Sequence, residues 1–359
     1  MNDFSGTRAV DAASDIELPA LQGWLSERLA GFEGEFSLAR FNGGQSNPTF
    51  LVRTAQQRAV LRCKPGPASR LLPSAHAIER EYRVMEALHG QGVPVPRMLA
   101  LCTDESVIGR AFYLMSMVEG RVLWDPTLPG LSSTERSAHY DEMNRVIAAL
   151  HRVDVSAAGL DDFGRPGNYF ERQIARWSSQ YRASITAPMD AMDRLIDWLP
   201  AHLPSSAAGH VGGSVVHGDY RLDNLVFHPT KARILAVLDW ELSTLGHPLA
   251  DFSYHCMAWH IPPGVFRGMA GQPLAELGIP GEADYVRRYC ERSGIADADA
   301  LAADWPYYLA YNLFRIAAIL QGIAKRVEDG TASSAQARES ASAARPLAEL
   351  GWQFALRHG

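Results

Sequence analysis

The stretch 217–241 constrains the fold of this chain more than any other part of its sequence. It reads HGDYRLDNLVFHPTKARILAVLDWE and holds two short apolar runs, at 225–227 and 234–238. The residues between the runs, His-Pro-Thr-Lys-Ala-Arg, are of kinds that form turns. Short apolar runs on either side of such a turn are typical of a β-hairpin. The sequence therefore predicts two antiparallel strands here.

Side chains with oxygen atoms stand at the open end of this predicted hairpin. A turn centred between Lys231 and Ala232 pairs Asn224 with Asp239, and directly opposed residues lie roughly 5 Å apart. An amide oxygen and a carboxylate that converge in this way suit Mg²⁺. Asp219 precedes Asn224 by five residues and could accept the proton of an attacking hydroxyl. We expect Asn224 and Asp239 to be metal ligands and Asp219 to be the catalytic base.

These residues resemble a known catalytic loop. The array His217-Gly-Asp219-x4-Asn224 resembles that of the protein-kinase-like fold, and its His-Gly-Asp form is that of the aminoglycoside phosphotransferase and choline kinase branch. Asp239 then stands at the position of the second metal-binding aspartate of that family. His217, whose imidazole can bond backbone groups, is expected to support the loop and not to act as the base.

A second element of the same family follows the hairpin. The segment LGHPLAD at 245–251 is similar to the family's Gly-Asp-Pro-x-x-Asp element, with His247 where an aspartate is usual. Asp251 fits either a helix N-cap or a brace for the catalytic loop. We expect Asp251 to give structural support. The departure at His247 concerns the geometry of this loop and not the metal ligands.

The first hundred residues are expected to supply the nucleotide half of the site. A Gly-rich segment between two predicted strands can turn tightly and direct backbone N–H groups at phosphate oxygens. Its candidate ATP-binding members are Gly43, Gly44, Ser46 and Asn47. On the next strand Arg62 and Lys64 share one face, because side chains alternate along a strand. Arg62 stands where the family carries Lys, and either cation could hold the α- and β-phosphates.

The resemblance implies further contacts for the nucleotide. The family pairs the strand cation with a helix glutamate, and of Glu79 and Glu81 the second fits the family's Arg-Glu pattern. Backbone groups of Met117 and Glu119 lie where the family has the hinge between its lobes and would bond adenine. These assignments imply ATP as the nucleotide, with GTP left open, and Mg²⁺ as the metal.

Three further segments narrow the resemblance. They read GGQSNPTF at 43–50, LLPSAH at 71–76 and LHRVD at 150–154. Together they look like the kinase domain associated with acyl-CoA dehydrogenases, within the aminoglycoside phosphotransferase family. Relatives in that subgroup are linked to phosphorylation of hydroxyacyl groups. The resemblance implies a small-molecule hydroxyl acceptor, with hydroxyacyl-CoA as one candidate. Because the 359 residues include no dehydrogenase domain, the chain is expected to act alone or with an acyl-CoA dehydrogenase in trans.

The expected fold class is α+β, a bilobal protein-kinase-like fold. It combines a small lobe at 1–118 with a larger, mainly helical lobe at 119–359. The small lobe is expected to hold an antiparallel sheet, one helix and a helical leader at about 15–30. The first is expected to bind the nucleotide, and the second to hold the catalytic loop and the acceptor. Residue patterns predict strands at 36–41, 49–54, 58–62, 98–101, 111–117 and 214–216. Apolar spacing predicts helices at 74–89, with Ser74 as N-cap, and at 133–152, 169–182 and 189–203.

Composition excludes several other classes of protein. The chain has 34 basic and 40 acidic residues, a net charge of −6 that argues against nucleic-acid binding. No run approaches the 18 apolar residues of a membrane span. The four cysteines are far apart, which indicates a reducing compartment, and the acidic N-terminus does not resemble a secretion signal. We expect a cytoplasmic protein without nucleic-acid or membrane partners.

We therefore expect an ATP-dependent kinase that phosphorylates an alcohol group of a small molecule. Two other classes stay open. A nucleotide-binding pseudokinase would keep the fold without transfer, although such proteins usually lose the Asp219 or Asp239 type. A metal-dependent hydrolase using His217, Asp219 and Asp239 is less favoured, since it leaves the Gly-rich strand pair unexplained.

Overall fold

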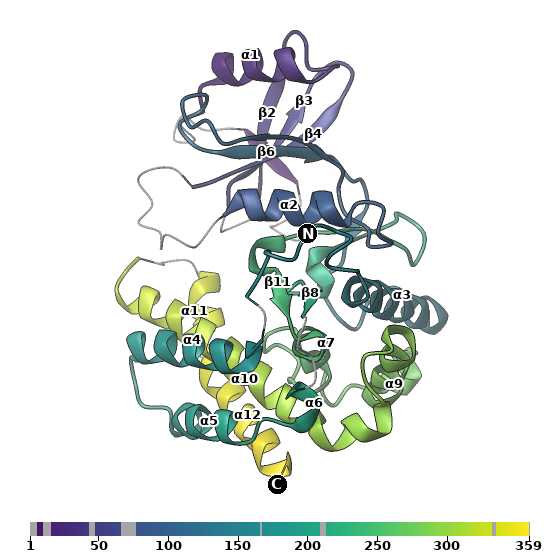
Figure 1. Cartoon of the computed structure of the whole chain (residues 1–359), viewed down its shortest axis with the longest axis vertical. Helices are drawn as coiled ribbons and strands as arrows, with labels where there is room; N and C mark the ends of the chain where they lie inside the picture. The colour runs from purple at the N-terminus through teal and green to yellow at the C-terminus, as the bar shows by residue number, and fades with distance from the viewer. Residues whose placement is uncertain are drawn as a thin grey trace. The chain divides into compact units, whose positions relative to one another are not determined.

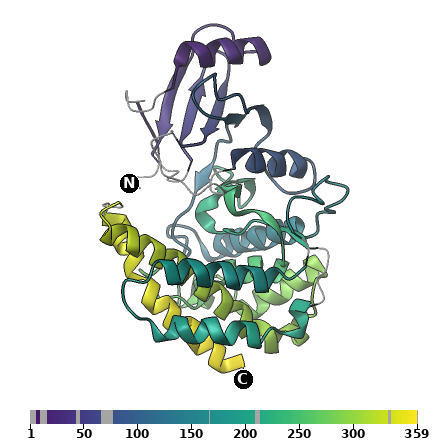
Figure 2. The same cartoon turned by 60° about the vertical axis from the view of Figure 1, so that its left-hand side comes forward.

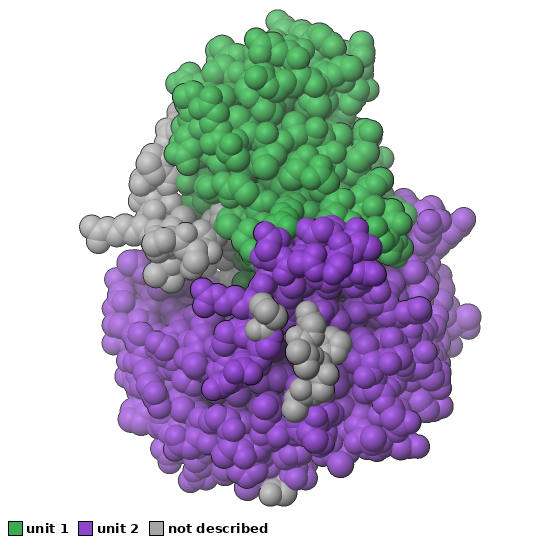
Figure 3. All heavy atoms as spheres, viewed as in Figure 1, with its two compact units in different colours: residues 1–121, 235–243 green, residues 122–234, 244–359 purple. Residues whose placement is uncertain are grey.

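The chain forms two compact units in a computed structural model, which describes residues 6–9, 16–42, 47–65, 77–165, 167–208, 213–331 and 335–358. The first unit comprises Met1–Arg121 with Leu235–Ser243, and the second comprises Val122–Ile234 with Thr244–Gly359 (Figure 3). The short segment 235–243 therefore belongs with the N-terminal unit, although it lies far along the chain.

Within the described residues, the first unit contains a six-stranded antiparallel sheet that two helices cover (Figure 1). The strand order is β1-β2-β3-β4-β6-β5. The strands are β1 (Thr7–Ala9), β2 (Ser37–Phe41), β3 (Thr49–Arg53), β4 (Arg58–Cys63), β5 (Met98–Cys102) and β6 (Phe112–Ser116). Helices α1 (Leu18–Arg28) and α2 (Ile78–Leu88) lie on opposite sides of the sheet. Each predicted strand is present within two residues of its expected bounds.

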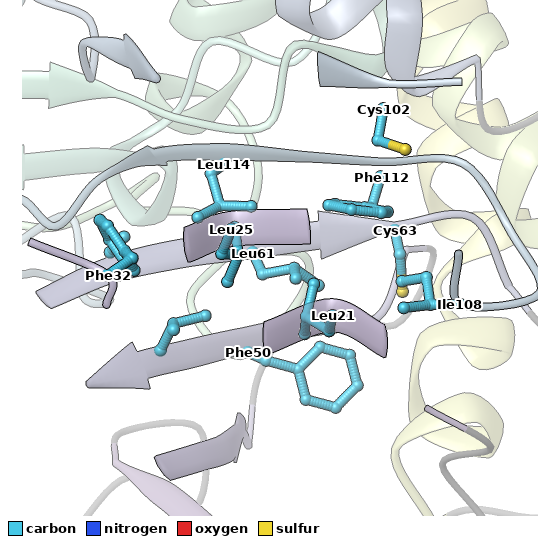
Figure 4. Packing of buried hydrophobic residues seen from close by; sticks show 12 residues of the cluster. Leu21, Leu25, Phe32, Phe50, Leu61, Cys63, Cys102, Ile108, Phe112 and Leu114 are labelled. Atoms are coloured by element: carbon cyan, nitrogen blue, oxygen red, sulfur yellow. The ribbon is translucent and has the colours of Figure 1, made fainter. Parts of the chain in front are cut away.

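Alternation along β4 decides which residues face each side of this sheet. Ala59, Leu61 and Cys63 are buried in the apolar cluster that α1 covers with Leu21 and Leu25 (Figure 4). The residues between them therefore face the other side, where α2 lies. In the sheet Arg62 is paired with Thr49 of β3 and Tyr113 of β6. The alternation along β4 thus places the Arg62 side chain on the face of the sheet that α2 covers.

Helix α2 is shorter than the sequence predicted. It begins at Ile78, with Ala77 at the N-cap position, and the predicted N-cap, Ser74, lies outside the described residues. Its apolar stripe of Ile78, Val84, Met85 and Leu88 is buried, and so is Glu81. A glutamate within the buried stripe of a helix needs polar partners on the facing sheet.

The second unit is mostly helical (Figure 2). Its helices are α3 (Ser133–His151), α4 (Tyr169–Ala183), α5 (Asp190–Ala201), α6 (Ser205–Ala208), α7 (Pro248–Cys256), α8 (Leu274–Leu277), α9 (Glu282–Ser293), α10 (Ala298–Glu328), α11 (Ala335–Ser342) and α12 (Ala344–His358). The long helix α10 packs against α12, α4 and α7. The predicted helices at 133–152, 169–182 and 189–203 correspond to α3, α4 and α5. The expected α+β class, with one mainly β and one mainly helical part, is confirmed.

Two short strands position the central loop of this unit. β8 (Ser214–Val216) pairs antiparallel with β11 (Thr244–Gly246), with Val216 opposite Thr244. The chain leaves β8 into the loop 217–221 and the 3₁₀ turn Leu222–Asn224, and it leaves β11 into helix α7. The pairing therefore brings the start of α7 beside the loop that contains Asp219.

The hairpin after this loop has a different turn from the one predicted. β9 (Leu225–Phe227) and β10 (Ile234–Val237) lie where expected. However, the His228 N–H donates to the Arg233 carbonyl at 2.7 Å, which centres the turn between Thr230 and Lys231. The predicted centre, one residue later, is wrong, and the argument that set Asn224 directly opposite Asp239 fails with it.

The described helices were also compared with what a membrane span needs. None of those in the part of the chain that the structure describes is long and apolar enough to cross a membrane.

Candidate functional site

Arg62 stands at the centre of a buried cluster of charges in the first unit. Its Nε lies 3.0 Å from Glu81 Oε2, and its Nη2 lies 2.8 Å from Asp239 Oδ1. Glu241 Oε2 is 3.6 Å from the same Nη2. Burial alone would lower the pKa of Arg62, but Glu81, and after it Asp239 and Glu241, raise this pKa above its usual range. The guanidinium is therefore charged and fixed by carboxylates from two segments.

Glu81 is fixed in turn by neutral donors. Asn47 Nδ2 donates to Glu81 Oε1 at 2.8 Å, and the Tyr113 hydroxyl donates to Oε2 at 3.1 Å. Burial raises the pKa of the Glu81 carboxyl, but two hydrogen bonds and the Arg62 ion pair favour its charged form. The Asn47 side chain thus reaches the helix glutamate. Sequence reasoning missed Tyr113, although the same strand alternation that orients Arg62 could have indicated it.

The second strand cation makes a separate pair. Lys64 Nζ lies 2.6 Å from Glu79 Oε1, and both side chains are about one-third exposed. Arg62, by contrast, is 9% exposed. Each of the two candidate cations therefore pairs with one of the two candidate glutamates. Arg62 and Glu81 form the buried pair, and Lys64 and Glu79 form the more exposed one.

Asp239 has an unusual backbone conformation. Its φ is +66° and its ψ is +61°, just before the 3₁₀ turn Trp240–Leu242. Non-glycine residues rarely occupy this left-handed region, and aspartate is among those that tolerate it best. Such conformations cluster at functional sites. The turn packs against α2, and the Arg62 ion pair holds the Asp239 carboxylate.

Asp219 is contacted by three side chains of the second unit. The Asn224 amide nitrogen donates to its carbonyl oxygen at 2.9 Å and to Oδ2 at 3.0 Å. The Tyr254 hydroxyl donates to Oδ1 at 2.6 Å, and Arg221 Nε lies 3.0 Å from the same oxygen in an ion pair. The structure therefore brings Asp219 and Asn224 together, as the sequence predicted, and adds Tyr254 from helix α7.

Asp251 supports the loop that contains Asp219 through hydrogen bonds to its backbone. Its two carboxylate oxygens accept from the backbone N–H groups of His217, at 2.7 Å, and Gly218, at 2.8 Å. His151 Nε2 lies 3.1 Å from Oδ2. Burial works to raise the pKa of Asp251, but the hydrogen bonds and charge of His151 and His217 outweigh it, so this pKa lies below its ordinary value. His247, not Asp251, occupies the N-cap position of α7.

The backbone between His217 and Asp219 turns sharply. Gly218 has a φ of +81°, which favours glycine. The Asp219 N–H donates to His217 Nδ1 at 3.1 Å, and Arg315 Nη2 donates to the Gly218 carbonyl at 2.5 Å. The peptide that precedes Asp219 is thus fixed by the nearby His217 and by Arg315 from helix α10.

A narrow cavity of about 60 Å³ lies beside this loop, within the second unit. Two of its lining residues, Arg221 and Tyr254, are those that contact the Asp219 carboxylate. Its walls are largely apolar and aromatic, and include Trp124, Tyr140, Met143, Ala258, Trp259 and Phe266. The ion pair of Asp223 with Arg267 lies at its edge. Such a cavity suits an apolar group next to a carboxylate.

Some predicted nucleotide contacts cannot be placed in the same way. Gly43, Gly44 and Ser46 lie outside the described residues. Glu119 has its carboxylate paired with Arg58. The contacts proposed for Met117 and Glu119 use backbone groups, and they stay predictions.

The predicted metal ligands lie in different units. Asn224 belongs to the second unit and Asp239 to the first, so their convergence stays a prediction. The described part of the chain holds no cluster of three or more His, Cys, Asp or Glu side chains placed for a metal. The chemistry of the pair still suits a hard cation. The Asn224 nitrogen is turned towards Asp219, which directs the amide oxygen to the other side.

Comparison with solved structures supports the fold assignment. A crystal structure from Ralstonia eutropha JMP134, assigned by name to the aminoglycoside phosphotransferases, is 59% identical, with a TM-score of 0.86 over 95% of this chain and 98% of that one. A choline kinase from Cryptosporidium parvum Iowa II is 11% identical, with a TM-score of 0.62 over 95% of each chain. An aminoglycoside phosphotransferase in a complex with AMP-PNP and hygromycin B is 16% identical, with a TM-score of 0.61 over 93% and 98%. The last two show the fold alone, which is the kinase-like fold expected.

Comparison with curated proteins points in the same direction. Acyl-CoA dehydrogenase family member 10 of Mus musculus is 48% identical over 98% of this chain and 32% of its own length. Acyl-CoA dehydrogenase family member 11 of Homo sapiens is 39% identical over 94% of this chain and 43% of its own length. The chain thus spans a third to under half of these relatives. Residues 37–305 match the model of the phosphotransferase enzyme family. The chain therefore belongs to the APH phosphotransferase enzyme family, as its resemblance had indicated.

Proposed function

We propose that this chain is an ATP-dependent O-phosphotransferase that moves the γ-phosphoryl group to a hydroxyl of a small molecule. The observation that carries the proposal is the Asp219 carboxylate, which is fixed by Asn224 and by Tyr254, a residue that lines an apolar cavity. A carboxylate so placed can accept a proton from a hydroxyl bound in that cavity. Membership of a phosphotransferase family supports the reaction class.

In the proposed reaction the chain positions and polarises the reactants. The acceptor oxygen forms a bond to the γ-phosphorus while the bond between this phosphorus and the β–γ bridging oxygen of ATP breaks, and the hydroxyl proton goes to Asp219. Arg62, charged and fixed by Glu81, would hold phosphate oxygens of ATP. Asn224 and Asp239 would hold Mg²⁺, which supplies neutralisation of the phosphate oxygens when bound. Asp251 keeps the loop in place throughout.

The cavity favours an acceptor with an apolar chain. Its walls are largely aromatic and aliphatic, and its charged groups are two arginines and one aspartate. Such walls offer no acidic field for a polycationic aminoglycoside, but they suit an acyl chain. The curated relatives are named as acyl-CoA dehydrogenase family members. We infer that a hydroxyacyl-CoA is the acceptor class.

An acceptor screen tests this proposal directly. Purified protein, ATP and Mg²⁺ would be incubated with hydroxyacyl-CoAs of several chain lengths, aminoglycosides, sugars and amino alcohols, and phosphorylated product would be detected by mass spectrometry. We expect the highest kcat/KM with a hydroxyacyl-CoA. An aminoglycoside phosphorylated as efficiently as any hydroxyacyl-CoA would overturn the acceptor class, and the absence of transfer to every hydroxyl would overturn the kinase assignment.

The two strand cations are expected to differ in their effect on ATP use. An Arg62→Met variant should lose at least ~100-fold in kcat/KM for ATP, since a preorganised charge on transferring phosphates contributes about that much. Lys64→Met removes an equally charged group from a pair with Glu79 that is about one-third exposed, and should change kcat/KM by less than about threefold. Initial rates at varied ATP measure both. A larger loss in Lys64→Met than in Arg62→Met would reverse the assignment.

The cavity is expected to set the preferred chain length. Ala258→Leu adds three carbons to a wall of a cavity of about 60 Å³. We expect KM for long-chain hydroxyacyl-CoAs to rise by roughly tenfold, since misplacing one or two methylenes in a tight pocket has such an effect, with little change for short chains. Ala302→Leu on an exposed turn of α10 is the matched control. An equal rise in KM for all chain lengths would argue against this cavity as the chain site.

A further inference from the structure

Each oxygen of the Asp219 carboxylate accepts one side-chain hydrogen bond from the protein. Tyr254 and Asn224 donate hydrogen bonds to Oδ1 and Oδ2, and the Arg221 ion pair also reaches Oδ1. An ionised carboxylate has about four lone-pair positions. Two donors, with the Arg221 guanidinium beside Oδ1, therefore leave the most room for an acceptor hydroxyl at Oδ2.

Tyr254 contacts both the Asp219 carboxylate and the cavity. Its side chain extends from helix α7, is 5% exposed, and lines the cavity while its hydroxyl lies on Asp219 Oδ1. Burial raises the pKa of Tyr254 well above its ordinary value, so the hydroxyl is a neutral donor. The tyrosine hydroxyl therefore occupies a lone pair of Asp219 Oδ1 that a water molecule could otherwise use.

Arg315 holds Tyr254 in this position. Its guanidinium carbon lies 5.1 Å from the centre of the Tyr254 ring, a distance typical of a cation–π contact. The same guanidinium donates to the Gly218 carbonyl at 2.5 Å. Arg315 is 6% exposed and comes from the middle of α10. One buried cation thus fixes both the tyrosine ring and the peptide that precedes Asp219.

We propose that Tyr254 is a specificity residue that favours phosphoryl transfer over hydrolysis of ATP. The proposal rests on the proposed kinase function. In transfer, the acceptor hydroxyl takes the open position on Oδ2, gives its proton to the carboxylate and receives the phosphoryl group. In hydrolysis, a water molecule would take the same part and release phosphate. By bonding Oδ1, Tyr254 keeps this oxygen from holding a water molecule that could attack the phosphoryl group.

A Tyr254→Phe variant tests the proposal. ADP and phosphorylated acceptor would be measured in the same reaction, and ADP would also be measured without acceptor. We expect transfer to fall by roughly tenfold, as for the loss of a hydrogen bond to a charged group, while ATP hydrolysed per phosphoryl transferred rises at least about fivefold and KM for ATP is unchanged. Tyr254→Leu, which also lacks the hydroxyl, should raise the same ratio.

Tyr307→Phe is the matched control. Tyr307 is a buried tyrosine of α10 whose hydroxyl donates to the Leu199 carbonyl at 3.1 Å, so its variant loses a buried hydroxyl away from Asp219 and should keep the ratio of the wild type. If transfer and hydrolysis fell in parallel in both Tyr254 variants, the inference would be overturned while the kinase function stood. If the wild type hydrolysed ATP but phosphorylated no acceptor, the proposed function itself would be overturned.

Discussion

Phosphoryl transfer by an Asp219→Asn variant is expected to fall by roughly 1,000-fold, within the range for loss of a general base. The amide has nearly the shape of the carboxylate, so Tyr254 and Arg221 keep a neighbour of the same size, but it cannot take up the acceptor proton. Intrinsic hydrolysis of ATP should fall with transfer. Affinity for ATP, measured by calorimetry, should stay within about threefold of the wild type, since the loop is braced independently by Asp251.

The Asp219→Asn variant also distinguishes the proposed kinase from a pseudokinase and from a metal-dependent hydrolase. Asp161→Asn, at an exposed position of the same unit, is the control and should keep full activity. A pseudokinase would bind ATP while neither wild type nor variant showed turnover. A metal-dependent hydrolase would act on its substrate without nucleotide and would lose that activity in the variant. Transfer that survived in Asp219→Asn within tenfold of the wild type would remove Asp219 from the role of base.

Elements set by local periodicity were predictable from the sequence. The strands around Arg62 and helices α3, α4 and α5 lie within a few residues of their expected bounds, because alternation and 3.6-residue spacing are properties of short segments. The family was predictable as well, since its motif is compact. The hairpin turn was missed by one residue: Pro-Thr-Lys-Ala at 229–232 contains no Asn-Gly or Asp-Gly pair to fix its centre.

Partners from distant segments were not predictable. Tyr254 is 35 residues from Asp219, and Tyr113 is 32 residues from Glu81. Arg315 is 97 residues from Gly218. Buried tyrosines and arginines look like ordinary core or surface residues in a sequence, and only packing decides which carboxylate or carbonyl each one meets. The pairing of Arg62 with Glu81 and of Lys64 with Glu79 was left open for the same reason.

Loss of the Asp251 charge is expected to have the largest effect on stability. In Asp251→Asn one of the two backbone donors, from His217 or Gly218, would face an amide nitrogen in place of an oxygen acceptor. An unsatisfied buried donor, together with a broken charged contact, corresponds to roughly 3 kcal/mol of unfolding free energy. Urea denaturation at neutral pH measures the loss. Transfer activity should also fall, because the turn that presents Asp219 loses its support.

The difference in unfolding free energy between the wild type and Asp251→Asn depends on pH, because folding lowers the pKa of Asp251. The pKa of Asp251 is lower in the folded protein than its ordinary value because hydrogen bonds from His151 and His217 outweigh burial. Its contribution to stability is therefore fully present above the unfolded pKa, near 4, and is lost as the pH falls through the folded value. The wild type should exceed Asp251→Asn by a constant amount between about pH 5 and 8, and by less at lower pH.

The control for this prediction is another aspartate whose partner lies on the surface. Asp284 pairs with Arg287 one turn along α9, and both side chains are more than half exposed. Asp284→Asn should change the unfolding free energy by less than about 0.5 kcal/mol at any of these pH values. A loss in Asp251→Asn as small as in Asp284→Asn would mean that the loop does not depend on its buried carboxylate. The fixed position of Asp219 would then need another cause, with Arg315 as the nearest candidate.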